Sequence, residues 1–579
     1  MLRAKTLRWT VAAAVIACPL AAAAKVPAVV QQIPADAQVF ITIPSLSGLS
    51  KKLSMLNQRL GLKQPQMNNV LGFVKAMSGI QHGIDDDGGA AIAITSLPLP
   101  SQGGARRGST AQPKGILLLP VKNYGQFIGN FGPSASGSGP LNTISIMGTP
   151  LYARQAGSFA VISNDRQQVV SYTPPAGSAG IAARSGHFGQ QVLTHSDISL
   201  GLNVAQFGPT FRPLLKQQLN QTVAAFRRMG PAAQMGDFMD AYLKIYGKIL
   251  DGVLRDGSVL AMGIDLSSRG VGLSYVAQFK KNSKLAAMFA KNPAQAPALN
   301  RLPNRPYLMA MSVDTSTLPL DQWSRDIVAA VPSDTVWGRL FGSSQHVLNA
   351  AGDQWQTVIF APNPGSRPGQ FATNGVWVVS TSDPDGFIGA YEKFVGDLNG
   401  LDLGGLGYQT EFQRDARQVA ERPVSQFKMR MKVSESLRRQ MGPNQAMIQD
   451  QTGLLVPVDD AVVAAINVDD ATLNQAIQAA GGQGQLDQNA GIALARKRLP
   501  KSHVGQMHFN VGALVQMIGQ FTGMPVQGGQ MSNLPPIAAA VSVQNGSIGA
   551  RAHVPMSVIT SVKNTFMAFA AGPMAARAR

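Results

Sequence analysis

The sequence predicts an α+β protein made of two tandem related units, each a mainly antiparallel sheet flanked by helices. The first observation is a repeated segment, because residues 115–131 (GILLLPVKNYGQFIGNF) align without a gap with residues 375–391 (GVWVVSTSDPDGFIGAY). The second is that strand-like runs follow one another across short turns, without the strict alternation with helices that builds parallel sheets. The third is length, because 579 residues exceed what one hydrophobic core usually serves. A repeat of this size predicts domain count and topology together.

Further features recur in the same order in the two predicted units. Within the aligned block, Gly115, Phe127, Ile128, Gly129 and Phe131 correspond at one constant interval to Gly375, Phe387, Ile388, Gly389 and Tyr391. Outside it, the corresponding features are Ile33-Pro34 with Leu302-Pro303, Asn203 with Asn510, and the two strands and helix of 259–290 with those of 537–570. Successions of strand, turn and helix are common, so coincidence stays the alternative to duplication.

The elements themselves follow from hydrophobic period and capping residues. A strand is expected at 38–43, followed by a helix whose leucines recur at helical spacing. The helix begins at Ser45 or Ser47, because a serine hydroxyl at this position accepts a hydrogen bond from a free backbone N–H of the first turn. The other elements expected in the first unit are a short helix at 67–77, strands at 90–95, 115–121, 144–147, 159–163 and 197–204, two long helices on either side of Gly230-Pro231, and a hairpin at 259–279. The second unit repeats strands at 357–360 and 376–381 around a loop at 362–374.

The two long helices carry apolar stripes at helical spacing. The residues are Leu215, Leu219, Val223 and Phe226 on one helix and Met235, Phe238, Tyr242, Ile249 and Val253 on the other. These stripes most simply belong to a core. The alternative is a groove for a lipid or another hydrophobic ligand, for which pliable methionines are suited.

The N-terminus has the layout of an export signal. Arg3, Lys5 and Arg8 precede an apolar run at 9–20, and the alanines at 22–24 suit cleavage before Lys25. The predicted boundaries are therefore a signal peptide at 1–24, a first unit at 25–291, a linker at 292–300 and a second unit at 301–579. The mature protein is expected in the periplasm or outside the cell. No later stretch has the roughly 18 consecutive apolar residues of a spanning helix, so no transmembrane segment is predicted.

Cys18 offers an alternative to simple cleavage. It is the only cysteine, and the sequence Val15-Ile16-Ala17-Cys18 resembles the bacterial lipobox, in which the cysteine receives the lipid anchor. Pro19 and the short apolar run argue against lipidation. In either case the folded region has no thiol, so no disulfide framework and no thiolate metal site is expected.

A strongly basic composition favours anionic partners. Lys and Arg number 50 against 31 Asp and Glu, a net charge of +19. The candidate contacts for a polyanion, such as an anionic envelope polymer, are Lys428, Arg430, Lys432, Arg496, Lys497 and Arg498. The first three alternate with apolar residues in FKMRMKV, the pattern of a half-buried strand, so a solvated sheet face compensated by Glu411 or Glu421 is the alternative. Nucleic acid is not expected, because no aromatic residues interleave with these cations.

Local motifs give no catalytic, cofactor-binding or metal-binding residues. GxSxG, HExxH, the phosphate-binding GxxxxGK loop and a complete GxGxxG are all absent from the sequence. Asp85-Asp86-Asp87-Gly88 lacks the later ligands of a calcium loop and is expected to be a solvated turn. His195-Ser196-Asp197 contains the letters of a triad, but adjacent residues cannot form the relay. No cofactor is therefore predicted, and enzyme activity is not the favoured interpretation.

Ile33-Pro34-Ala35-Asp36-Ala37, followed by a short strand and Pro44-Ser45-Leu46, resembles the opening of exported bacterial proteins classified as domains of unknown function. These proteins typically begin with Leu-Pro-Ala-Asp-Ala. The resemblance implies an envelope protein and assigns no functional residue. The sequence thus favours a non-enzymatic exported protein that acts by binding or as structure. The alternatives are a carrier or sensor of a lipid or other hydrophobic ligand, and attachment to polyanions through a basic surface.

Overall fold

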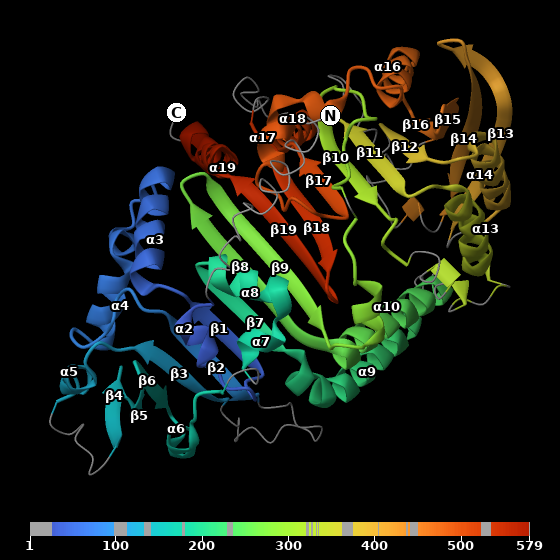
Figure 1. The fold of residues 1–579 in the computed structure, drawn as a ribbon. Coiled ribbons are helices and arrows are strands. Elements are labelled where there is room, and N and C mark those ends of the chain that lie inside the picture. Colours follow the sequence, from blue (N-terminus) through green and yellow to red (C-terminus); the bar gives the residue numbers. More distant parts are fainter. Residues whose placement is uncertain are drawn as a thin grey trace, which may run out of the picture.

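A computed structural model describes residues 26–577 apart from 98–112, 133–139, 177–179, 229–235, 294, 320–323, 326–327, 330, 332, 334, 362–373, 403–404, 436–437, 440–449 and 523–533. The predicted signal peptide and Cys18 lie outside this part of the chain. Figure 1 shows one long twisted sheet with helices on both faces. The α+β class and the antiparallel sheet predicted from the sequence are confirmed.

The sheet contains 19 strands in the described part of the chain. In the first half they are β1 Val39–Ile43, β2 Ala90–Ser96, β3 Lys114–Pro120, β4 Leu141–Ile146, β5 Thr149–Ala156, β6 Phe159–Ser163, β7 Ile198–Asn203, β8 Gly257–Ser267 and β9 Gly270–Phe279. In the second half they are β10 Tyr307–Asp314, β11 Gln354–Phe360, β12 Gly375–Ser380, β13 Leu406–Val419, β14 Arg422–Val433, β15 Gln451–Val458, β16 Ala461–Ile466, β17 Gly505–Phe509, β18 Ile537–Gln544 and β19 Ser547–Pro555.

The order of neighbouring strands recurs between the halves. The first half runs β4-β5-β6-β3-β2-β1-β7-β8-β9. The second runs β14-β15-β16-β12-β11-β10-β17-β18-β19, with β13 added outside β14. Each of these pairs is antiparallel, which fits the short connections between successive strands.

Register also recurs at residues that the sequence alignment picked out. Gly115 lies opposite Ile94, and Gly375 lies opposite Ile359 on the equivalent strand. A Cβ at either glycine would lie 2.7 Å from a carbonyl oxygen of the neighbouring strand. The N–H of Asn203 donates to the carbonyl of Gln38, two residues before Phe40.

The equivalent bond in the second half joins Asn510 to Leu308, two residues before Ala310. The two bonds measure 2.8 and 2.9 Å. Helix starts match as well, because the side chain of Asn123 caps the helix after β3 and that of Asp383 caps the helix after β12. The matching caps place the buried Phe127 and Phe387 at the same point of each half.

The two halves join through their corresponding last strands. β9 and β19 pair along their whole length, with Gly270 opposite Pro555 and Gln278 opposite Ser547. Ser274 and Arg551 lie opposite each other near the middle of this ladder. The sheet therefore continues from one half into the other without an edge, as Figure 1 shows in green and red.

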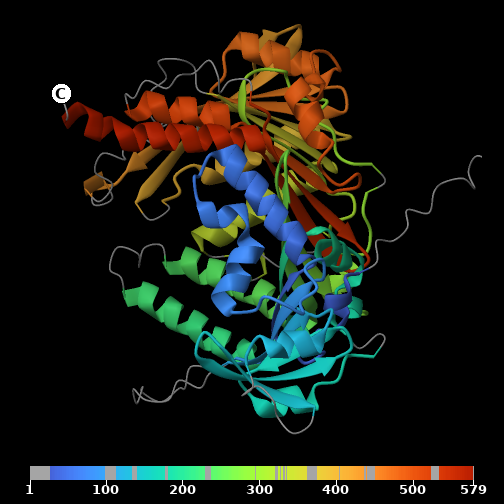
Figure 2. The same cartoon turned by 90° about the vertical axis from the view of Figure 1, so that its left-hand side faces the viewer.

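Helices divide between two faces, named here the α8 face and the open face. On the α8 face lie α2 Ala28–Gln31, α6 Arg166–Ser171, α7 Ile181–Arg184, α8 Gly186–His195, α16 Asp470–Ala480 and α17 Ala490–Arg496. On the open face lie α3 Leu46–Leu60, α4 Val70–Ser78, α5 Tyr124–Gly129, α9 Val204–Arg228, α10 Gly236–Asp256, α11 Lys284–Met288, α13 Val336–Ala350, α14 Pro384–Leu398, α18 Val511–Thr522 and α19 Met556–Arg577. Figure 2 shows α9, α10 and α19 projecting from one side of the sheet and α8 on the other.

The main cores lie under the helices of the α8 face. In the first half, Phe40 and Leu118 are fully buried with Leu193 of α8. In the second half, Val376 and Val463 are fully buried with Leu473 of α16. The segment 292–300, expected as a linker, packs into the second half, since Leu299 is fully buried and the Asn292 carboxamide oxygen accepts the Val543 N–H at 2.7 Å.

No helix in the described residues combines the length and the apolar composition that crossing a membrane requires.

Candidate functional site

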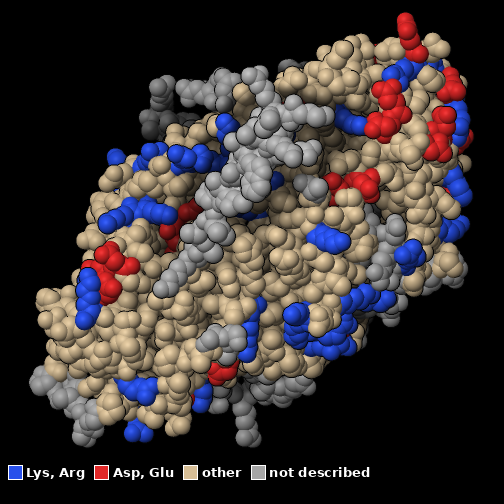
Figure 3. Space-filling model, in the orientation of Figure 1, with Lys and Arg blue, Asp and Glu red and all other residues tan. Residues whose placement is uncertain are grey.

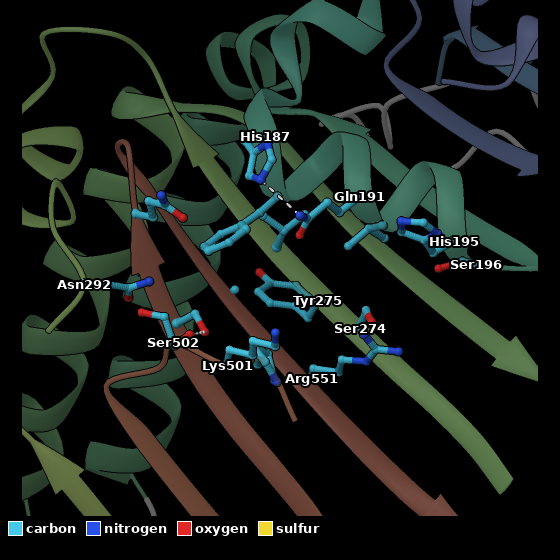
Figure 4. Close-up of a pocket in the computed structure, with 18 of the residues that line it drawn as sticks. His187, Gln191, His195, Ser196, Ser274, Tyr275, Asn292, Lys501, Ser502 and Arg551 are labelled. Carbon is cyan, nitrogen blue, oxygen red and sulfur yellow. Dashed lines mark hydrogen bonds between the residues drawn. The ribbon is translucent and has the colours of Figure 1, made fainter. Parts of the chain in front are cut away.

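A pocket of about 380 Å³ lies on the α8 face where the two halves join. The first half supplies α8, β8 and β9, and the second half supplies β18, β19 and the turn that leads into β17. The polar side chains around it are His187, Gln191, His195, Ser196, Asp265, Ser274, Asn292, Lys501, Ser502, Ser542, Gln544 and Arg551. Figure 4 shows His187 and Gln191 on the α8 side, with Lys501 and Arg551 across from them.

Close packing of α8 on the sheet positions one wall of this pocket. Val192 packs against Ala261 and Val276 of β8 and β9. A Cβ at residue 263 would lie 1.9 Å from the Ser196 hydroxyl, so Gly263 is what lets the end of α8 lie against β8. His187, Gln191 and His195 are four residues apart, and this spacing places them on one side of α8 along the pocket.

The opposite wall is held by bonds to β18. The Ser542 hydroxyl donates to the carbonyl of Ser502 at 2.7 Å, and the N–H of Val504 donates to the carbonyl of Val541 at the same distance. These bonds fix the turn that carries Lys501. The pocket walls therefore come from fixed elements on both sides.

The pocket lining is positively charged. Lys501 and Arg551 are exposed, and no acidic side chain in the described residues forms an ion pair with either. The single carboxylate in the lining, Asp265, lies 3.4 Å from the Lys52 ammonium, which also pairs with Asp197 at 2.9 Å. Burial, and then the charges of Arg498 and Arg551, lower the pKa of His553 on β19. Positive groups thus gather around this end of the joint.

Next to the pocket, the second half encloses an unusual set of basic groups. His508 is fully buried and His503 is 2% exposed. His503 Nδ1 donates to the Pro500 carbonyl at 2.8 Å and His508 Nε2 donates to the Gln506 carboxamide at 3.0 Å. The other ring nitrogens, and two nitrogens of Arg496, are buried and have no hydrogen-bond partner among the residues that the structure describes.

The burial of these groups controls their charge. Burial, with a smaller effect from the charge of Arg496, lowers the pKa of His508 to about 4. Burial also lowers the pKa of His503. Both rings are therefore neutral near pH 7, which leaves each with an unpaired acceptor nitrogen beside the unpaired donors of Arg496.

The open face of the same central strands is apolar and exposed. Nine large side chains there are between 36% and 53% exposed: Ile41, Ile92, Leu200, Met262, Ile264, Leu273, Tyr275, Met507 and Val541. We call them the apolar floor. Their side chains alternate along each strand with those that face α8, so the floor and the pocket lie on opposite faces.

Register makes the apolar floor continuous. Ile92 lies opposite Ile41, Ile41 opposite Leu200, Leu200 opposite Met262 and Met262 opposite Tyr275. Directly opposed side chains on neighbouring strands are in contact distance. The floor therefore crosses the middle of the sheet as one strip and is not a set of isolated exposed residues.

Helices border the apolar floor at both ends of the strands. α3 and α19 pack at one end, through the cluster of Leu56, Leu266 and Met556. α10 and α11 pack at the other end, where Val253 joins the core that contains Phe279. Between these helices the nine side chains of the floor keep 36% to 53% of their surface exposed.

The long helices only partly match the stripes predicted for them. Val253 is core, as expected, whereas Ile249 is 60% exposed, so a core role is wrong for that residue. Met235 lies outside the described residues, as do the side chains of Val223, Phe226, Phe238 and Tyr242.

The polyanion candidates fall into two separate places. On β14, Lys428, Arg430 and Lys432 are exposed on one face as the alternation predicted, and Glu411 lies directly opposite Lys428. Arg430 lies 3.7 Å from Asp450. This stripe is thus partly compensated.

The second group lies beside the pocket. Arg496 is largely enclosed, Lys497 is exposed and Arg498 is half-buried near His553. Figure 3 shows basic side chains in several separate groups on the α8 face. The structure therefore does not join the two sets of candidates into one basic surface.

The remaining motif fragments have structural roles. The Asp197 carboxylate accepts the Leu266 N–H at 2.7 Å and pairs with Lys52, so it is not oriented toward His195 as in a triad. Asp86 pairs with Lys75, and Asp87 accepts the Ser47 hydroxyl, as expected for a structural turn. In the described part of the chain no group of three metal-ligating side chains comes together.

Sequence reasoning missed His187, His195, Lys501 and Arg551 as pocket residues. They are distant in sequence and converge only because β9 pairs with β19. The one local signal was the basic run at 496–501, which adjoins the pocket. Comparison with protein-family models, with curated proteins and with solved structures found no match for this chain.

Proposed function

We propose that this protein is an exported, non-catalytic binding protein that carries a lipid or similarly hydrophobic ligand on the apolar floor. The observation that carries the proposal is the strip of exposed apolar side chains in the middle of the sheet, in which Ile92, Ile41, Leu200, Met262 and Tyr275 are directly opposed in turn. Single exposed hydrophobic residues are ordinary, but a contiguous strip on a soluble domain marks an interaction site.

The chemistry of the strip favours a hydrocarbon occupant. The side chains that form it offer carbon, the sulfur of Met262 and Met507, and one hydroxyl, on Tyr275. Its backbone groups are already paired within the sheet, because all its strands are interior. A protein interface of this size usually includes several hydrogen bonds. An acyl chain needs none, and methionines adapt to a mobile chain.

Charge is consistent with an anionic lipid as the source of that chain. The net charge of +19 favours approach to anionic headgroups and to the membrane surfaces that contain them. The predicted export signal, and the resemblance of Ile33-Pro34-Ala35-Asp36-Ala37 to exported envelope proteins, support a location where such lipids occur.

The proposal includes duplication of one ancestral unit. The recurring strand order, the equivalent glycines Gly115 and Gly375, and the equivalent bonds of Asn203 and Asn510 support it. Joining through β9 and β19 then turns two sheets into one and produces a floor longer than either half could offer. Attachment to a polyanion through Lys428, Arg430 and Lys432 is a weaker candidate, because Glu411 and Asp450 lie beside them.

The test uses Leu200→Glu and Met262→Glu, which place a charge on the floor without changing a buried residue. The matched control is Met147→Glu, at a hairpin turn where Met147 is 72% exposed. Native mass spectrometry of gently purified protein should show bound lipid for wild type and M147E, and an empty protein for the floor variants. Displacement of a fluorescent fatty acid should weaken at least tenfold in L200E and M262E.

Two results would remove the proposal. One is a wild-type protein that carries no lipid and does not bind the fatty acid. The other is a concentration-dependent dimer that M262E abolishes, since a second copy would then cover the floor. Circular dichroism of each variant separates loss of binding from loss of fold.

A further inference from the structure

We infer that the pocket on the α8 face binds a small polar molecule through its phosphate or carboxylate group. This site is independent of the apolar floor, because it lies on the other face of β8, β9, β18 and β19. The inference rests on two cationic side chains, Lys501 and Arg551, that line a pocket with fixed walls and form no ion pair with a described acidic residue. It depends on neither export nor lipid binding.

Lys501 and Arg551 are the groups that would hold the oxyanion. Neither has an acidic partner among the described residues, and Figure 4 shows both at the same side of the cavity. An unpaired guanidinium presents a fork of N–H donors that matches two oxygens of a phosphate or carboxylate. The lysine adds a second, movable charge.

Further donors converge on the pocket from fixed positions. The Asn292 carboxamide oxygen accepts the Val543 N–H at 2.7 Å, which leaves the amide NH₂ of Asn292 to donate. The Gln191 amide donates to His187 Nε2 at 3.0 Å, which leaves Nδ1 as the ring nitrogen that can donate. Preset donors of this kind bind an anion without much loss of side-chain entropy.

The remaining lining suits the polar remainder of such a molecule. The Asp265 carboxylate and the Ser274 hydroxyl can accept hydrogen bonds from ligand hydroxyls. A cavity of about 380 Å³ is in the size range of small-molecule sites and does not suit a polymer.

The pairing of β9 with β19 gives the pocket one anion-binding end instead of two. Arg551 of β19 lies opposite Ser274 of β9, near the centre of the ladder where the halves meet. Two identical halves would place the same residue at both positions. Here only the second half contributes a guanidinium, so one oxyanion is bound, toward Lys501.

The experiment measures binding of inorganic phosphate, citrate and glucose to the full chain by isothermal titration calorimetry at low salt. We expect saturable binding of phosphate or citrate and none of glucose, with affinity falling as salt rises. Arg551→Gln and Lys501→Gln should each weaken binding at least tenfold. Lys428→Gln and Arg430→Gln remove the same charge from β14 and should change the affinity less than twofold.

Three outcomes would overturn the inference. They are absence of saturable binding by either anion, equal loss in the β14 controls, and retention on heparin without binding of small anions. The last would indicate attachment to a polymer. Because Lys501 and Arg551 are exposed, their variants should unfold at the wild-type midpoint, and M262E should keep its anion affinity whether or not it binds lipid.

Discussion

Phe40 of β1 covers Gly201 of β7, and the ring lies where a side chain of residue 201 would be. The two residues are directly opposed, and a Cβ on Gly201 would lie 1.9 Å from the ring. At the equivalent place in the second half, Ala310 of β10 lies opposite His508 of β17. In the first half the large side chain is Phe40 on β1, and in the second half it is His508 on β17.

This relationship predicts a compensating pair of substitutions. Ala310→Phe alone should destabilise the protein by about 1–3 kcal/mol, because the ring overlaps His508. His508→Gly alone should cost about 2–4 kcal/mol through a cavity. The double variant reproduces the pair Phe40 and Gly201. Its loss of unfolding free energy, measured with urea, should be smaller than the sum of the two single losses by at least about 1 kcal/mol.

Met507→Gly is the matched control, since Met507 neighbours His508 but faces the apolar floor. Combined with A310F it should give no recovery. Strict additivity of A310F with H508G would show that the two positions do not share one volume.

The glycines of the aligned block predict a second pair of equal effects. Gly115→Ala and Gly375→Ala each bring a Cβ to 2.7 Å from a carbonyl oxygen of the next strand, so a backbone must shift. Each should lose about 1–3 kcal/mol of unfolding free energy. Gly396→Ala in the last turn of α14, where a Cβ meets nothing within 4 Å, should instead gain about 0.5–1 kcal/mol. Thermal unfolding measures all three, and a neutral G115A beside a damaging G375A would contradict the equivalence.

Local signals in the sequence were sufficient for much of the fold. The cap at Ser45 begins α3 as predicted, and the alternation in FKMRMKV placed Lys428, Arg430 and Lys432 on one exposed face. Both depend on neighbours in sequence, through a side chain bonding the next turn or a two-residue period. Such interactions are visible without knowing the tertiary structure.

The candidate sites could not be predicted in the same way. The apolar floor consists of ordinary strand residues such as Ile41 and Met262, whose exposure depends on which helices cover the sheet. The pocket exists because β9 pairs with β19, and no local pattern encodes which strands form the joint. No local pattern marks His508 for burial either, because Ala310 comes to lie opposite it only when β10 pairs with β17.

Asp197 predicts a measurable link between α3 and the sheet. Its carboxylate accepts the Leu266 N–H at 2.7 Å and lies 2.9 Å from the Lys52 ammonium. Burial alone would lower the pKa of Lys52, but the hydrogen bonds and charges of Asp197 and Asp265 together outweigh it and raise the pKa. Asp197→Ala should therefore cost about 1–3 kcal/mol in denaturant unfolding, mainly through the unpaired Leu266 N–H. Glu392→Ala breaks a solvent-exposed pair with Arg414 and should cost less than about 1 kcal/mol, so equal losses would contradict the link.

His508 predicts that the second half weakens in mild acid. The unfolded chain takes up a proton on this ring near its ordinary pKa of about 6.5, whereas the folded protein does so only at about 4. Between these values the unfolded state binds more protons, so stability falls as the pH drops from about 6.5 and stops falling below about 4. The total is on the order of 3 kcal/mol, and His503, whose pKa burial also lowers, adds in the same direction.

Urea unfolding at a series of pH values between 7.5 and 4 measures this slope, and His508→Asn should flatten it because the asparagine cannot take up a proton. H508N is expected to be less stable than wild type at pH 7.5 and to lose that disadvantage as the pH falls. His82→Asn, which removes an exposed histidine, should keep the wild-type slope. If the pH dependence of the unfolding free energy persists in H508N, other groups cause the acid sensitivity. If His508 causes it, removing the imidazole must remove this pH dependence.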